Sequence, residues 1–138
     1  MRLFTFAGTR PPGLGVTASG LAPCPSSPNC VASDAADPLH HVAPLALALP
    51  AGEAWRAARA AVASLPRTII VTETDDYLHA ECASRIFGFV DDLELHLRAA
   101  QDIIAVRSAA RIGYSDLGVN RRRIETLRST LAKQGVVR

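Results

Sequence analysis

The sequence predicts a single α+β domain in which two helices pack on one face of an antiparallel β-sheet. Two stretches carry apolar side chains at helical spacing, and the other regular stretches have the length and alternation of β-strands. The elements follow one another as strand, helix, four-strand meander and helix, and the short links of the meander join antiparallel neighbours. A chain of 138 residues with 49% hydrophobic and 20% charged residues is typical of one globular domain.

The first strand and the first helix are expected on either side of a proline. Residues Val42–Leu49 form an apolar run of strand length that ends at Pro50. Residues Ala51–Leu65 are rich in alanine and predict a helix, which Pro66 ends. One stripe of this helix carries Trp55, Ala58, Val62 and Leu65.

The meander and the last helix occupy the second half of the chain. Four strands are expected at about Thr68–Thr74, Tyr77–Ala83, Phe89–Arg98 and Asp102–Ala110. A helix is expected over Val119–Lys133. Its buried face carries Asn120, Ile124, Leu127 and Leu131.

Alternation along the strands separates an apolar face of the sheet from a polar one. Successive residues of a strand point to opposite faces, so each strand contributes to both. We expect the apolar face to pack on the helices and the polar face to be solvated. The apolar face carries Leu78, Ala80, Cys82, Leu93, Leu95 and Leu97, and the polar face His79, Glu81, Asp92, Glu94 and His96.

The N-terminal segment, residues 1–23, is expected to be an irregular or partly disordered arm, and residues 24–138 a single folded domain. The apolar run Leu3–Phe6 is too short for the ~7–15 apolar residues of a secretory signal. No stretch approaches the ~18 consecutive apolar residues of a membrane span. These observations favour a cytoplasmic protein without a transmembrane segment.

The loop between Cys24 and Cys30 is stiffened by two prolines, and it leaves three interpretations open. A disulfide would add about 2–3 kcal/mol to stability through loop closure. A metal site would recruit His40 and His41, although the cysteine spacing matches no common zinc pattern. The third interpretation is a pair of buried thiols. No metal and no cofactor is predicted.

A cluster of charged and polar residues is expected where the sheet meets the last helix. If residues 99–101 close the last hairpin, Leu93 faces Arg107. Asp91 and Arg107 then lie diagonally on the apolar face, and Arg111 continues the same parity. Charges on the core side of a sheet are costly unless they are paired.

The connection 113–118 leads into the last helix, where Asp116 or Ser115 is expected to cap the first turn. Asn120 lies on the apolar stripe, and arginines occupy positions 121–123. Cations near a helix N-terminus are unfavourable, so a negative partner or ligand is expected there.

Three interpretations of this cluster remain open: an Asp–Arg network that fixes the helix to the sheet, a pocket for a small anion or polar head group, and a catalytic site. No residue is assigned a catalytic or metal-binding role. The candidate ligand-binding residues are Asp91, Asp92, Arg107, Ser108, Arg111, Asp116, Asn120 and Arg121.

Parts of the sequence resemble the domain of unknown function 1499 family. The resemblance rests on Cys-Pro-Ser-Ser-Pro-Asn-Cys at 24–30, on the Pro-containing pairs at 37–38 and 44–45, and on the segments 87–94 and 107–123. It covers nearly all of the expected folded part. It implies a small single domain found in bacteria and plastids, for which no established activity can be carried over. Many members of the family carry a leader or membrane segment.

The leading functional hypothesis is a non-catalytic binding or accessory domain that holds a small anionic or lipid-like, amphipathic ligand near the Asp/Arg cluster. One alternative is a small hydrolase acting on a phosphorylated or acyl substrate, with Asp92 or Asp116 as the base. Another is a protein-interaction module that presents Glu81, Glu94 and His79 on the polar face. Fifteen basic and 13 acidic residues give a net charge of +2, which does not indicate a nucleic-acid-binding protein.

Overall fold

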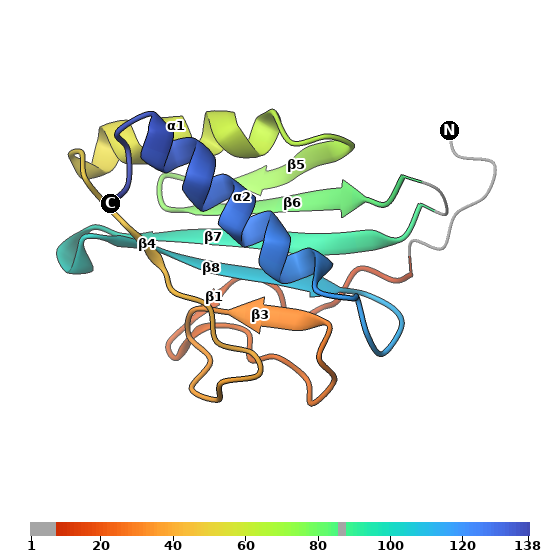
Figure 1. Cartoon of the computed structure of the whole chain (residues 1–138). Helices are drawn as coiled ribbons and strands as arrows, with labels where there is room; N and C mark the ends of the chain where they lie inside the picture. Colours follow the sequence, from red (N-terminus) through yellow and green to blue (C-terminus); the bar gives the residue numbers. More distant parts are fainter. Residues whose placement is uncertain (1–7, 86–87) are drawn as a thin grey trace.

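The computed structural model describes residues 8–85 and 88–138. It confirms the α+β fold: helices α1 (Ala51–Ala63) and α2 (Val119–Lys133) lie across one face of a central sheet (Figure 1). The short apolar run near the N-terminus lies outside the described residues. Among the described residues, no helix combines the length and the apolarity that crossing a membrane requires.

Six strands form the main sheet, and each named strand pairs antiparallel with its neighbours. They are β3 (Cys30–Ala32), β4 (Leu45–Ala46), β5 (Thr68–Glu73), β6 (Tyr77–Ala83), β7 (Val90–Arg98) and β8 (Ile103–Ala110). From edge to edge the order is β3, β8, β7, β6, β5, and β4 also pairs with β8. The predicted meander is therefore present, with strand ends within one residue of those expected.

The core lies between the sheet and the two helices. Small side chains such as Ala54, Ala58 and Val62 form the buried stripe of α1, which lets this helix approach the strands closely. Leu127 and Leu131 belong to the buried face of α2, and the bounds of this helix agree with the prediction. From the sheet, the core receives Leu78, Ala80, Leu93, Leu95, Ile104 and Val106.

The first predicted strand is mostly irregular, which corrects the prediction for Val42–Leu49. Only Leu45–Ala46 pair with β8, and Pro44 just before them has no N–H to extend the ladder. Beyond them, Leu47 forms an isolated bridge with Val137 of the C-terminal tail. Apolar composition therefore marked burial correctly, although the backbone partners of this segment differ from those of a regular strand.

The β7–β8 hairpin is one residue out of the predicted register. Residues Ala99–Gln101 form a 3₁₀ turn, and Asp102 follows in the left-handed conformation with φ 59°. Asp102 therefore belongs to the loop, and Arg98 faces Ile103. Every residue of β8 consequently faces a partner one position away from the one expected.

This shift overturns the predicted pairing of Asp91 with Arg107. Arg107 faces Glu94, and Ser108 occupies the position opposite Leu93 that was predicted for Arg107. Because neighbouring residues of a strand point to opposite faces, Arg107 moves from the helix side of the sheet to the other side.

The N-terminal segment covers that other side. Strands β1 (Val16–Thr17) and β2 (Gly20–Leu21) pair as a small hairpin. Leu21 is buried in a small apolar cluster with Tyr77 and Ala105. Gly20 has φ 106°, and a side chain there would collide with the Asp34 carboxylate. Leu21 thus anchors this segment on the sheet.

Candidate functional site

The start of α2 brings four of the predicted ligand-binding residues into one cluster, which we call the helix-side cluster. Ser108 and Asn120 are completely buried, and the Ser108 hydroxyl donates to Asn120 Oδ1 at 2.6 Å. Asn120 Nδ2 donates to Asp116 Oδ2 at 2.8 Å. Asp91 of β7 completes the cluster through an ion pair with Arg123.

Arg123 is the central cation of the helix-side cluster, and the sequence analysis did not include it among the candidates. Its Nη2 lies 2.9 Å from Asp91 Oδ2. Its Nη1 donates to Asn120 Oδ1 at 2.7 Å and to Ser108 Oγ at 3.1 Å. The spacing from Asn120 to Arg123 is i,i+3, so both residues share one helix face, and this signal could have identified the arginine.

Asp116 stabilises the N-terminus of α2. Its carboxylate accepts from the backbone N–H groups of Gly118 at 2.8 Å and Asn120 at 3.0 Å. Burial opposes ionisation of this carboxyl group, but hydrogen bonds from the side chain and backbone of Asn120 and from Gly118 lower its pKa overall. An ionised Asp116 at this position stabilises the positive end of the helix dipole.

Asp91 differs from the other carboxylates of the site. Its side chain is 13% exposed, and burial raises its pKa although Arg123 acts in the opposite direction. Buried titratable groups with one charged partner, when they border a pocket, are frequent at functional sites.

A pocket of about 380 Å³ lies next to Asp91 and Asp116, and we call it the apolar pocket. Most of its wall is apolar, formed by residues at the ends of β7 and β8 and at the start of α2. The apolar wall includes Phe89, Ala110, Ile112, Gly113 and Val119, and the polar wall Ser84, Asp91, Ser115 and Asp116.

A second charged cluster lies on the opposite side of the sheet, so the prediction of a solvated polar face is wrong. Arg111 donates to both carboxylate oxygens of Asp92 at 2.8 Å, and His79 Nε2 lies 2.7 Å from Asp92 Oδ1. Asp92 is 1% and His79 3% exposed. Burial opposes ionisation of Asp92, but hydrogen bonds from Arg111 and His79 lower its pKa.

Glu94 and Arg107 form a second buried pair on this side. Glu94 Oε2 accepts from the Tyr77 hydroxyl at 2.6 Å and from the Gly15 N–H at 2.8 Å. Arg107 Nη1 lies 3.5 Å from Glu94 Oε1, and its Nη2 donates to the Pro23 carbonyl. Glu94 is completely buried. The N-terminal segment contributes a hydrogen bond to each member of this ion pair, through Gly15 and Pro23.

The grouping of His79, Glu81 and Asp92 resembles a metal-binding set, since their ligand atoms lie within 4.8 Å of one another. Arg111 lies among these groups and donates to both Glu81 and Asp92. A guanidinium there already supplies the positive charge that a metal ion would bring. The arrangement is therefore that of an ion-pair network, not of a cation site.

The eight predicted residues thus belong to three separate places. Asp91, Ser108, Asp116 and Asn120 form the helix-side cluster. Asp92, Arg107 and Arg111 lie on the opposite side of the sheet. Arg121 instead donates to the backbone carbonyls of Leu39 and His41, at 3.1 and 2.9 Å, and connects the loop between β3 and β4 to α2.

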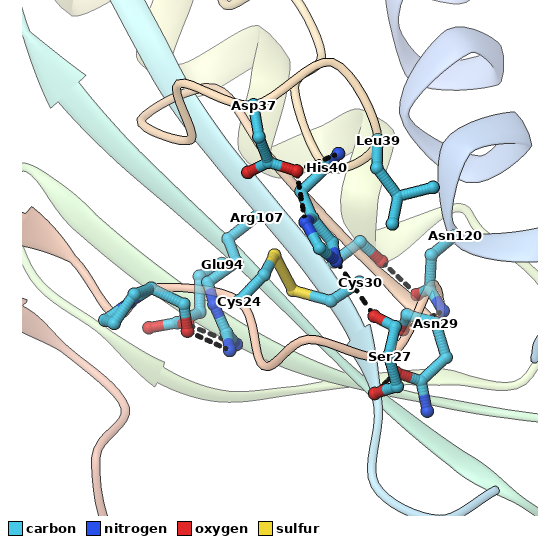
Figure 2. Close-up of a disulfide and its surroundings, with 12 residues drawn as sticks. Cys24, Ser27, Asn29, Cys30, Asp37, Leu39, His40, Glu94, Arg107 and Asn120 are labelled. Carbon is cyan, nitrogen blue, oxygen red and sulfur yellow. Dashed lines mark hydrogen bonds and ion pairs between the residues drawn. A yellow bond between two sulfur atoms is a disulfide. The ribbon is translucent and has the colours of Figure 1, made fainter. Parts of the chain in front are cut away.

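The cysteines of the Pro-containing loop form a disulfide, Cys24–Cys30, at the start of the edge strand β3 (Figure 2). Both ring nitrogens of His40 are engaged, with Asp37 at 2.6 Å and the Ser27 carbonyl at 2.9 Å. With the sulfurs bonded to each other and His40 occupied, these residues do not form the metal site considered from the sequence.

We expect the double substitution Cys24→Ser/Cys30→Ser to lower the free energy of unfolding by about 2–3 kcal/mol, because it removes a covalent loop closure. Urea unfolding followed by circular dichroism measures this change. A reductant should lower the stability of the wild-type protein by a similar amount and leave the double variant unchanged. Equal stability of the oxidised, reduced and double-variant proteins would contradict the expectation.

Residues 20–131 match the model of a family described as "Protein of unknown function (DUF1499)". The match includes both charged clusters, the disulfide and the apolar pocket. No curated protein and no solved structure matches the chain.

Proposed function

The chain belongs to the DUF1499 family, and from this premise we propose that it is a non-catalytic binding domain for a small amphipathic ligand. The ligand occupies the apolar pocket, with its apolar part against Phe89, Ile112 and Val119. Its polar end lies beside the helix-side cluster.

The apolar pocket is the observation that carries this proposal. At about 380 Å³ it is within the range of ~300–1,000 Å³ that is typical of small-molecule sites. Phe89, Ile112 and Val119 are each 39–40% exposed, and all three line the pocket. A ligand there would remove apolar surface from water, which is the main source of affinity for such molecules.

Neither of the two carboxylates considered as the base of a hydrolase, Asp92 and Asp116, is in a state that supports this role. A hydrolase would need a carboxylate with a raised pKa at the reacting atom. Asp92 is held by Arg111 and His79, Asp116 by the first turn of α2, and both have lowered pKa values. The interaction module that required Glu94 and His79 on an open polar face is not supported, because both side chains are buried.

The cytoplasmic location stays a prediction, and the Cys24–Cys30 disulfide weighs against it. Stable structural disulfides are rare in reducing compartments. We therefore favour an oxidising compartment for this domain. In the denatured protein isolated from its native compartment, a mass about 2 Da below the fully reduced value would agree with this location.

Titration with N-phenyl-1-naphthylamine, a neutral dye that fluoresces in apolar surroundings, tests the binding proposal. We expect saturable binding by the wild-type protein. Ala110→Leu places a larger side chain in the pocket and should weaken binding about tenfold or more. The same substitution at exposed Ala100, in the turn between β7 and β8, is the control and should leave binding unchanged. Absent binding, or equal binding by the Ala110→Leu variant, would contradict the proposal.

A further inference from the structure

A second pocket, of about 250 Å³, lies under the same helix, and we call it the arginine pocket. It is an open pocket bordered by the turn between α1 and β5, the adjoining ends of β5 and β6, and the first half of α2. Three arginines line it: Arg67, Arg122 and Arg123. Thr68 and Thr126 add hydroxyl groups, and no carboxylate is in the wall described.

Two of these three positive charges are not neutralised. Arg123 is paired with Asp91 at 2.9 Å. Arg67 Nε donates only to the Ala83 carbonyl at 3.2 Å, and Arg122 Nη1 only to the Leu117 carbonyl at 2.9 Å. Within the described residues, neither Arg67 nor Arg122 forms an ion pair.

Arg67 and Arg122 are exposed, and one hydrogen bond to a backbone carbonyl orients each guanidinium group. Arg67 is fixed further by its own carbonyl, which accepts from the Ala83 N–H at 2.9 Å. Arg122 lies in the first turns of α2, where the helix dipole makes a cation unfavourable. An anion in the pocket would interact favourably with both arginines and with the start of the helix.

The arginine pocket and the apolar pocket adjoin each other. Val119 lines both of them. Asp91 lines the apolar pocket and its partner Arg123 lines the arginine pocket, so this ion pair forms part of the boundary. Val119 and this ion pair thus separate two neighbouring pockets, and a ligand that occupied both would cross them.

We propose that the arginine pocket binds a carboxylate or phosphate head group and that the ligand of this domain is an amphipathic anion. Its head group contacts Arg67 and Arg122, and its apolar chain occupies the apolar pocket. This inference rests on the proposed binding function and adds the charge of the ligand to it.

Competition against bound N-phenyl-1-naphthylamine at low ionic strength tests the inference with three probes. Decanoate carries a chain and a charge, 1-decanol the chain alone, and acetate the charge alone. We expect decanoate to displace the dye at a concentration about tenfold below that of 1-decanol, and added salt to reduce this difference. Acetate should not displace the dye.

The variant Arg67→Gln/Arg122→Gln should bind the dye as the wild type does but lose the preference for decanoate. The control Arg56→Gln/Arg138→Gln removes the same charge from exposed sites away from the pocket and should keep the preference. If the wild type shows no preference, or if Arg67→Gln/Arg122→Gln retains it, this inference is wrong while the binding function stands. If acetate displaced the dye as well as decanoate does, the claim that the ligand is amphipathic would be wrong, and the result would indicate a site for a free anion. Failure of the wild type to bind the dye would overturn both proposals.

Discussion

Replacing Arg111 by alanine is expected to lower the free energy of unfolding by about 3–5 kcal/mol. The Arg111 side chain is 6% exposed and makes a two-pronged contact with Asp92, whose side chain is 1% exposed. Among the described residues, its removal leaves the buried Asp92 carboxylate with His79 as its one side-chain partner. Equilibrium unfolding in urea at neutral pH measures the loss.

The control for this prediction is Arg10→Ala, which removes another arginine of the same network. Arg10 also contacts Glu81, but its side chain is 54% exposed, and we expect a loss below about 1 kcal/mol. A loss for Arg111→Ala as small as that for Arg10→Ala would contradict a buried network.

The effect of Arg111→Ala should also depend on pH. Arg111 lowers the pKa of folded Asp92 below 3.8, so its stabilising contribution is present above that pH and is lost as the pH falls through the folded value. The difference in stability between the wild type and Arg111→Ala should therefore shrink on acidification below about pH 4.

Replacing Arg107 by alanine is the second substitution with a large expected effect, again about 3–5 kcal/mol. It strands Glu94, which is completely buried, and removes the hydrogen bond to the Pro23 carbonyl in the segment that covers the sheet. Beyond the loss of stability, we expect faster proteolytic cleavage within residues 8–23. Urea unfolding and limited proteolysis followed by mass spectrometry measure the two effects.

The double variant Glu94→Gln/Arg107→Ala separates charge burial from simple loss of contacts. Glutamine keeps an acceptor for the Tyr77 hydroxyl and for the Gly15 N–H but carries no charge. The double variant should therefore be more stable than the single variant Arg107→Ala. If the double variant is no more stable than Arg107→Ala, a stranded charge is not the cause of the loss.

Local sequence signals predicted both helices and the four strands of the meander well. The helix Val119–Lys133 and the strand Tyr77–Ala83 have the expected bounds, because their periodicities are unbroken and turn-forming residues flank them. The helix Ala51–Leu65 was also expected, although it ends at Ala63, before the turn at Pro66. In these elements, local preference and burial favour the same conformation.

The register of the last hairpin depended on a feature without a strong local signal. Asp102 adopts the left-handed conformation, which is uncommon for residues other than glycine, and thereby lengthens the loop by one residue. That single residue moved Arg107 to the other side of the sheet. Alternation correctly grouped the polar side chains on one face, but could not reveal that the N-terminal segment covers that face.

The same error in register explains why the candidate site was predicted only in part. Asp91, Ser108, Asp116 and Asn120 do meet beneath α2, but the cation among them is Arg123. In the assumed register, Arg107 would have been the partner of Asp91 across the hairpin. The actual partner, Arg123, lies three residues after Asn120 on the same face of α2.

Chemical-shift mapping with decanoate tests the central claim, a ligand site beneath the start of α2, most directly. We expect saturable shifts of the backbone amides of Phe89, Asp91, Ile112 and Val119, the residues around the apolar pocket. Amides of the segment that covers the opposite side of the sheet, such as those of Gly15 and Leu21, should keep their chemical shifts. The absence of saturable shifts, or shifts centred on the opposite side, would contradict a binding site beneath this helix.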